Sequence, residues 1–237
     1  MTYNSQNTYD YKLGSFFVSD EVVSLDKNEQ KIVDDFHKLY FKHLERKSGL
    51  QISWMGVQTG KIPGDLWIYQ EMMSKIKPDF IVECGTHHGG SAFFLANICQ
   101  MLDHGRVLTI DLYPKPNRPS HKLLQYIEGS STDPTIVKKV HETVGAAKNV
   151  LVLLDSNHTK EHVLQEINNY KDLVPVGGYL IVEDSFLNGN PSHEEFGAGP
   201  MEAIADFIAN NKNFIIDKDM ERFLFTLNRN GFLKRTK

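Results

Sequence analysis

The sequence predicts an α/β fold built on an open, mostly parallel sheet. Apolar runs of strand length alternate along the chain with segments of helix length, as in proteins made of βαβ units. Most of these runs end in an acidic residue, at the point where an open sheet binds its ligands. The length of 237 residues and the hydrophobic content of 41% suit one large domain with a substantial core.

The N-terminal residues 1–51 are expected to form an extension of this domain. Residues 1–27 are polar and aromatic, and they predict either a disordered tail or a strap over a neighbouring chain. Residues 28–47 carry apolar side chains at helical spacing among many charges, which predicts an amphipathic helix ended by Gly49.

Residues 54–65 are predicted to be a loop, because they contain three glycines and a proline. Asp65 is expected to cap a helix over residues 66–76, which Pro78 stops. Lys61 and Asp65 are candidates for the edge of a site, with solvated loop charges as the simpler alternative.

Residues 80–92 are predicted to form the strand, tight turn and helix that open a nucleotide-binding sheet. Glycines allow close backbone approach in the turn, and the helix directs its free N–H groups at a ligand. Glu83 adds a negative charge to the crevice, which suits a cationic or hydroxyl-rich ligand better than a pyrophosphate. The glycine pattern differs from G-x-G-x-x-G, so a turn that only packs a helix on a strand remains the alternative.

Two further strands are predicted over residues 106–111 and 123–128. The first ends in Asp111, about 20 residues past the glycine turn, where an acid in this architecture accepts hydrogen bonds from ribose hydroxyls. A capping or turn aspartate is the alternative. Ser130 and Ser131 follow the second strand and are candidates to contact a purine.

Three carboxylates are expected to meet at the ends of the next two strands. Residues 149–155 form an unbroken apolar run that ends in Asp155, and residues 179–183 end in Glu183, followed by Asp184. If these strands are neighbours, the acids repel one another unless a cation lies between them or one is protonated. Oxygen ligands favour Mg²⁺, with Mn²⁺ or Ca²⁺ as alternatives. Helix capping and a carboxylate pair acting without a metal are the other interpretations.

His158 is the candidate general base. It follows Asp155 at the start of a predicted helix, whose dipole is expected to lower the pKa of the imidazole. A neutral imidazole beside a metal-bound hydroxyl suits proton abstraction, with a capping histidine as the alternative. Residues 158–162 also match the H-x-x-E-H pattern of some zinc proteases, but His162 adjoins an apolar stripe and the nearby oxygens favour a harder ion.

The last part of the chain predicts a cover and an antiparallel pair of strands. Residues 185–199 are a long, glycine-rich connection of the kind that covers a site. A helix is expected from about 200 to 211. Residues 213–216 and 222–227 predict two short strands, and so short a link forces them to be antiparallel.

Composition excludes some functions. The net charge of −4 and the lack of a basic run argue against nucleic acid as a partner. The lack of a signal peptide and of an apolar run of about 18 residues predicts no membrane association. A cytoplasmic location is therefore expected, with Cys84 and Cys99 as reduced thiols.

Taken together, these residues resemble a known family. The run ECGTHHGGSA at 83–92 resembles the first motif of class I S-adenosylmethionine-dependent methyltransferases. More specifically, residues 52–235 resemble the cephalosporin hydroxylase and sugar (rhamnosyl, macrolide) O-methyltransferase family. The shared segments are Trp54-x-Gly56, Lys61-x-Pro63-x-Asp65, Lys77-Pro78-Asp79, Gly129-Ser130-Ser131, Asp155-Ser156-Asn157-His158, His162-Val163-Leu164, Gly199-Pro200 and Gly231-Phe232-Leu233-Lys234-Arg235.

The resemblance implies a Rossmann-like class I methyltransferase domain over residues 52–237, with a seven-stranded sheet whose last strand is antiparallel. It implies that S-adenosylmethionine lies over the glycine turn and that Mg²⁺ is bound beside it. Family members are commonly homo-oligomers. The implied cofactor contacts are Glu83, Gly85, Thr86, Gly90, Ser91, Asp111, Ser130, Ser131 and Asp155. The implied metal ligands are Asp155, Glu183 and Asp184, with His158 and Asp155 as catalytic residues.

The expected function is that of a Mg²⁺-dependent S-adenosylmethionine O-methyltransferase acting on a small hydroxylated acceptor, such as a sugar or a natural product. The chain departs from the family at Asn157, where an acid is frequent. One alternative is a hydroxylase-associated cofactor-binding protein of the cephalosporin hydroxylase type. The other is a non-catalytic binding subunit, for which clustered acids would have no use.

Overall fold

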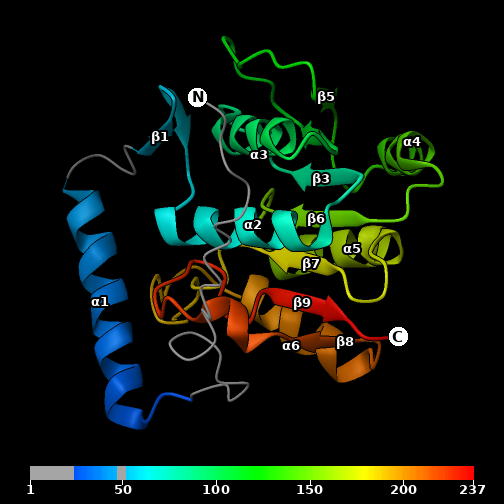
Figure 1. Ribbon diagram of the computed structural model, residues 1–237. Coiled ribbons are helices and arrows are strands. Elements are labelled where there is room, and N and C mark those ends of the chain that lie inside the picture. Colours follow the sequence, from blue (N-terminus) through cyan, green and yellow to red (C-terminus); the bar gives the residue numbers. More distant parts are fainter. Residues whose placement is uncertain (1–23, 47–51) are drawn as a thin grey trace, which may run out of the picture.

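The computed structural model describes residues 24–46 and 52–237 (Figure 1). The helices are α1 (Lys27–Glu45), α2 (Pro63–Ile76), α3 (Gly90–Met101), α4 (Pro134–Val144), α5 (Lys160–Tyr170) and α6 (Pro200–Asn210), with short 3₁₀ helices η1 (Lys171–Leu173) and η2 (Lys218–Glu221). Of the segment 1–27, predicted to be a tail or a strap, residues 1–23 lie outside the described residues, and α1 already begins at Lys27. The predicted helix end at Gly49 also lies outside the described residues.

The main sheet has seven strands in the order β5-β4-β3-β6-β7-β9-β8. They are β3 (Phe80–Cys84), β4 (Arg106–Asp111), β5 (Leu124–Glu128), β6 (Val150–Leu154), β7 (Tyr179–Val182), β8 (Phe214–Ile216) and β9 (Phe232–Arg235). The pairs from β5 to β7 are parallel, whereas β9 runs antiparallel to both β7 and β8. The predicted seven-stranded sheet with an antiparallel last strand is therefore confirmed.

Helices cover both faces of the sheet, as the unbroken apolar strands require. Along β6, Val150, Val152 and Leu154 pack in a core shared with α4, α5 and α6. The alternate residues Leu151 and Leu153 pack in a second core with α2 and α3. This alternation follows from the two-residue period of a strand. The carboxyl edge of the parallel strands is therefore fixed between two packed layers of helices.

The predicted loop at residues 54–65 is wrong in part, because it contains the turn and the second strand of a hairpin and the first residues of α2. Strands β1 (Ile52–Trp54) and β2 (Val57–Thr59) pair antiparallel. The two turn residues have positive φ, 47° at Met55 and 84° at Gly56. Such angles suit a two-residue hairpin, but the usual Asn-Gly or Asp-Gly signal is missing.

Asp65 is not the helix cap that was predicted. Helix α2 begins earlier, with Pro63 at its first position and Ile62 as the N-cap residue. Asp65 lies buried in the first turn, and its carboxylate accepts a hydrogen bond of 3.0 Å from the backbone N–H of Leu227. The acid therefore ties α2 to a loop that is distant in sequence.

The predicted strand at residues 222–227 is also wrong. This segment forms turns after η2, and the antiparallel partner of β8 is β9, further along the chain. Leu224 has a φ of 65°, which is incompatible with a strand, and Phe223 and Leu224 are about half exposed. Their apolar character indicated a strand that the backbone does not form.

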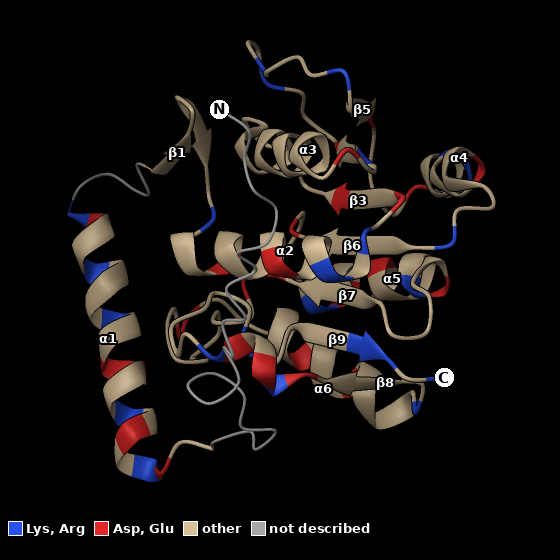
Figure 2. Cartoon of the chain, viewed as in Figure 1, with Lys and Arg blue, Asp and Glu red and all other residues tan. Residues whose placement is uncertain are grey.

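Helix α1 confirms the predicted amphipathic helix. Asp26 accepts hydrogen bonds from the first turn while Glu29 reaches back, which makes a capping box. Phe41 stacks on Phe186 with ring centroids 4.3 Å apart, so α1 rests on the segment after β7. Figure 2 shows basic and acidic residues interspersed along this helix. Among the described residues, no helix has the length and apolar character needed to span a membrane.

Candidate active site

A cavity of about 290 Å³ opens beyond the carboxyl ends of the parallel strands. The predicted cofactor contacts that line it are Gly85, Asp111, Ser130 and Ser131. Gly85 has a φ of 97°, and a Cβ there would lie 1.9 Å from the carbonyl oxygen of Asp155. Only glycine lets the ends of β3 and β6 approach so closely. Gly85 therefore lets the loops after β3 and β6 pack against each other at the cavity.

Asp111 organises the rim of this cavity. Its Oδ2 accepts hydrogen bonds from the backbone N–H groups of Thr86 at 3.1 Å and His87 at 2.7 Å, and it pairs with Arg118 at 2.8 Å. Its Oδ1 accepts one from Tyr113 at 2.7 Å. Among the described residues Oδ1 accepts this one hydrogen bond, so it can accept another from a ligand hydroxyl. The ribose role of Asp111 stays a prediction.

Glu83 lies elsewhere than expected. Its side chain is fully buried and does not line the cavity. One oxygen accepts a hydrogen bond from Ser91 and the other from Thr109, both at 2.5 Å. A Cβ at Gly90 would lie 2.2 Å from the carbonyl oxygen of Gln58, so this glycine accommodates the β1–β2 hairpin. Direct cofactor contacts by Glu83, Gly90 and Ser91 remain predictions.

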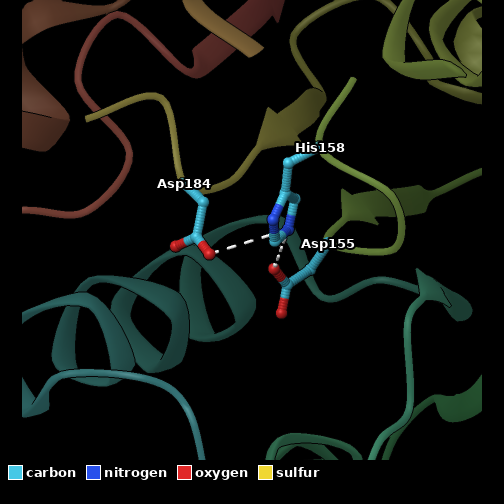
Figure 3. Close-up of side chains that lie close together, drawn as sticks. All are labelled: Asp155, His158 and Asp184. Carbon is cyan, nitrogen blue, oxygen red and sulfur yellow. Dashed lines mark hydrogen bonds and ion pairs between the residues drawn. The ribbon is translucent and has the colours of Figure 1, made fainter. Parts of the chain in front are cut away.

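The carboxylates after β6 and β7 do come together, because these strands are hydrogen-bonded neighbours. Figure 3 shows Asp155, His158 and Asp184, which we call the acid cluster. His158 Nε2 lies 3.2 Å from Asp155 Oδ1 and 3.6 Å from Asp184 Oδ2. One potential ligand atom from each residue lies within 4.8 Å of the others. The acid cluster thus has the dimensions of a metal site.

Glu183 is not a member of the acid cluster, and one of its oxygens pairs with Lys61. The ammonium of Lys61 lies 2.7 Å from Glu183 Oε2 and also contacts Asp155 Oδ2. Lys61 is only 3% exposed, although the sequence suggested a residue at the edge of a site. The buried Oε1 of Glu183 has no hydrogen-bond partner among the described residues.

These residues fit a hard divalent ion. Asp155 and Asp184 offer oxygens within reach of one position, and Glu183 has a buried oxygen with no other partner in the described chain. Such an orphaned oxygen is costly unless something binds it. His158 joins the two aspartates in the present arrangement, so the predicted ligand set of three carboxylates stays a prediction.

The charges around His158 overturn one expectation. Burial lowers the pKa of His158, but its hydrogen bond to Asp155 and the charges of Asp184 and Asp155 raise it to about 9. The predicted lowering by the helix dipole is therefore wrong for this arrangement, because two nearby carboxylates outweigh one helix end. Burial raises the pKa of Asp155, yet Lys61 and His158 together lower it to about 2. Burial and the charge of Asp155 raise the pKa of Asp184 to about 6.

In protein freed of metal by chelation, we expect the imidazole of His158 to titrate near pH 9, above the value near 6.5 of an unperturbed histidine. Because the folded-state pKa is raised, this proton stabilises the fold fully below about pH 6.5, and the stabilisation is lost as the pH rises through about 9. NMR of the histidine ring protons measures the titration, with His158→Gln for assignment. A pKa at or below 6.5 would contradict the ion pairing seen here.

Comparison with known proteins identifies the family. The family described as Rhamnosyl O-methyltransferase/CmcI matches residues 46–236. The chain belongs to this family. It is 35% identical over 213 residues to the rhamnosyl O-methyltransferase of Mycobacterium bovis (strain BCG / Pasteur 1173P2), covering 86% of this chain and 85% of that protein. It is 34% identical over 213 residues to the rhamnosyl O-methyltransferase of Mycobacterium leprae (strain TN), covering 86% and 90%.

Solved structures of CmcI share the fold of this chain. The CmcI-N160 apo-structure has a TM-score of 0.61 at 19% identity and covers 78% of this chain and 76% of its own. The structure named cmcI-D160 Mg-SAM has a TM-score of 0.59 at 18% identity, covering 78% and 77%. The predicted resemblance is therefore confirmed, and with it the predicted class of enzyme, an O-methyltransferase.

Sequence reasoning missed two features of this family member's site. The first is Lys61 as a buried counter-ion, for which the only signal was a lysine two residues before Pro63 in a shared motif. The second is a buried cluster around Glu166, an acid within the apolar stripe of α5. The two histidines of the H-x-x-E-H pattern also separate. His158 joins the acid cluster, whereas His162 faces Glu166.

Proposed function

We propose that this protein is a divalent-cation-dependent S-adenosylmethionine O-methyltransferase that methylates a hydroxyl of a small acceptor, a sugar or a natural product. The supporting observation is the adjacency of a cavity of nucleoside size to the acid cluster: Ser156 and Asn157 line the cavity, and Asp155 and His158 flank them in sequence. Family membership supports the chemistry, since the curated relatives are named rhamnosyl O-methyltransferases. A similar structure is named for Mg-SAM.

The proposal assigns the cavity to the cofactor's nucleoside, with Asp111 toward the ribose and Ser130 and Ser131 toward the purine. Asp155, Glu183 and Asp184 are proposed to hold Mg²⁺. When bound, S-adenosylmethionine supplies an activated methyl group, and the cation supplies charge that orients and acidifies the acceptor hydroxyl. Binding both partners in one crevice lowers the entropic part of the barrier.

His158 is proposed to take the proton from the acceptor hydroxyl as the oxygen attacks the methyl group. Two aspartates hold its imidazole. Asp155, just after β6, has Oδ1 3.2 Å from the ring Nε2, and Asp184, after β7, has Oδ2 3.6 Å from the same nitrogen. With a pKa of about 9, the ring carries a proton at neutral pH. It becomes a base when the negative charge of the two aspartates is offset by a cation.

The two alternative functions have less support. Oxygen chemistry on non-haem iron commonly uses two histidines and one carboxylate, whereas the acid cluster holds one histidine and two carboxylates. A non-catalytic subunit would have no need for buried acids that repel one another beside a cavity. Assembly into a homo-oligomer remains a prediction from the resemblance to the family.

Cofactor binding is the direct test of the proposal. Calorimetric titration of the full chain is expected to show one site for S-adenosylmethionine and for S-adenosylhomocysteine. Incubation with sugars and glycosides bearing free hydroxyls is then expected to yield a methyl ether, detected as a mass increase of one methylene. If neither nucleoside binds, with or without Mg²⁺, the proposal is withdrawn.

Metal removal tests the second half of the proposal. Treatment with EDTA is expected to abolish turnover, because the acid cluster without its cation lacks the charge that offsets the carboxylates. Added Mg²⁺ is expected to restore turnover. S-adenosylhomocysteine affinity in the chelated protein serves as the control and should change less than turnover. Full turnover in the presence of excess EDTA would show that the acids act without a metal.

A further inference from the structure

Helix α1 buries a histidine that has no polar partner. His37 is fully buried, and neither nitrogen of its ring has a hydrogen-bond partner among the described residues. Such a group costs stability, and the cost rises steeply when the group carries a charge. We propose that α1 is a latch on the segment that follows β7, closed while this imidazole is neutral and opened when the ring gains a proton. The latch does not depend on the reaction proposed above.

The segment that α1 contacts connects two residues of the acid cluster. It comprises residues 185–199, which we call the β7–α6 segment, and it starts directly after Asp184. At its far end, a Cβ on Gly199 would lie 3.2 Å from the carbonyl oxygen of His158. Figure 1 shows α1 apart from the helices that cover the sheet, on the side toward which the parallel strands point. The latch therefore acts on a segment that adjoins the acid cluster at both ends.

Two kinds of contact fasten α1 to the β7–α6 segment. Phe41 of α1 stacks on Phe186, with ring centroids 4.3 Å apart. Arg229, in the loop before β9, joins the two sides. Its Nη1 lies 3.0 Å from Asp34 Oδ1 on α1 and donates a hydrogen bond of 3.3 Å to the carbonyl oxygen of Asn190. Because a few side chains hold the helix on loops, we expect α1 to be among the first elements to open locally.

The surroundings of His37 disfavour its charged form. Its ring lies against that of Phe225 in an edge arrangement, with centroids 4.5 Å apart. Burial and the charge of Arg229 lower the pKa of His37, whereas the charge of Asp34 raises it. The lowering prevails, and the pKa of His37 falls to about 4. A proton on this ring would therefore be a buried charge beside a guanidinium, which undocking of the helix would relieve.

Other titratable groups lie at the same contact. In the β7–α6 segment they are His193, whose ring centroid lies 5.2 Å from that of Phe41, and Glu194, which lies 3.7 Å from Lys38. At the start of α2 the contact is apolar, through Ile62. The test therefore changes His37 itself and leaves these groups in place.

The sign of the pH effect follows from the two states of α1. In the undocked helix the imidazole is expected to titrate near the ordinary value of about 6.5, and in the docked helix near about 4. Docking is therefore strongest above about pH 6.5 and weakens as the pH falls toward about 4. Between about pH 7.5 and about pH 5, the docking equilibrium is expected to weaken about 30-fold.

Native-state hydrogen exchange of the full chain, corrected for intrinsic exchange rates, measures this opening. In the unchanged chain, opening at residues 36–41 is expected to rise about 30-fold from about pH 7.5 to about pH 5. Exchange at residues 186–193 is expected to rise with it, because Phe186 then loses Phe41. In His37→Leu the rise is expected to be less than about threefold, since the ring that gains the proton is gone. His37→Phe, which keeps a ring against Phe225, is the second variant and is expected to behave alike.

The matched control is His43→Leu, which removes an exposed histidine of the same helix and is expected to keep the about 30-fold rise. The amides of β6, in the centre of the sheet, report global unfolding and are expected to stay protected at about pH 5. Any one of four results overturns the latch. They are a rise of less than about threefold in the unchanged chain, an equal rise in both His37 variants, a parallel loss of protection in β6, and an opening of α1 that leaves residues 186–193 protected.

Discussion

Replacing His158 by alanine is expected to lower kcat for methyl transfer by about 10²- to 10⁴-fold, the usual contribution of a general base. The affinity for S-adenosylhomocysteine is expected to stay within about threefold, because the side chain faces Asp155 and Asp184 and does not line the cavity. Single-turnover kinetics and calorimetry on the same preparation separate the two effects.

The control for this variant is His104→Ala, which removes a half-exposed imidazole far from the strand ends that carry the site. It is expected to keep full turnover. A parallel loss of turnover and cofactor affinity in His158→Ala would make His158 a structural residue. A turnover close to that of the unchanged chain would assign the base to another group.

Replacing Lys61 by methionine is expected to destabilise the metal-free fold by about 3–5 kcal/mol, the cost of breaking a buried ion pair. The ammonium is almost fully buried between Asp155 and Glu183, and the charge of Glu83 also acts on it. Without it these carboxylates face one another with less compensation. Urea unfolding measures the free-energy change.

Added Mg²⁺ is expected to recover more stability in Lys61→Met than in the unchanged chain, since the ion then supplies charge that the ammonium no longer provides. The control is Lys38→Met, which removes a surface partner of Glu194 at 3.7 Å. An exposed pair contributes little, so a change within about 1 kcal/mol is expected there. If Lys61→Met costs no more than this control, the buried pairs do not stabilise the fold.

Much of the fold could be predicted because the central strands are locally determined. The runs that became β3, β4, β6 and β7 are mostly apolar and each has an acid at or just beside its carboxyl end, so their type was predicted correctly and their bounds to within one or two residues. The β1–β2 hairpin was missed because its turn, Met55-Gly56, lacks the usual residue at the first position. The strand predicted at residues 222–227 does not form, because these residues are in a turn. From that turn Phe223 lies against α2, and Phe225 and Leu227 belong to the cluster that packs on α1.

The candidate site was predictable in its position but not in its contacts. Acids at the carboxyl ends of neighbouring strands must share one edge of the sheet, and Asp155, Glu183 and Asp184 do so. Both acids follow the end of β7, and Asp184 has a φ of 52°, so strand alternation does not set their directions. In the folded chain Glu183 meets Lys61 while Asp184 meets His158. The raised pKa of His158 also depends on these contacts.

The sequence by itself indicated the family, through its resemblance to shared motifs. It also determined the alternation of strands and helices and the edge at which the acids gather, because these depend on local periodicity and chain order. Only the tertiary structure decided which side chains meet. Lys61 reaches Asp155 across 94 positions of sequence, and Ser131 reaches Glu166 across 35. Such pairs form because packed layers bring distant loops together, and local pattern carries no information about them.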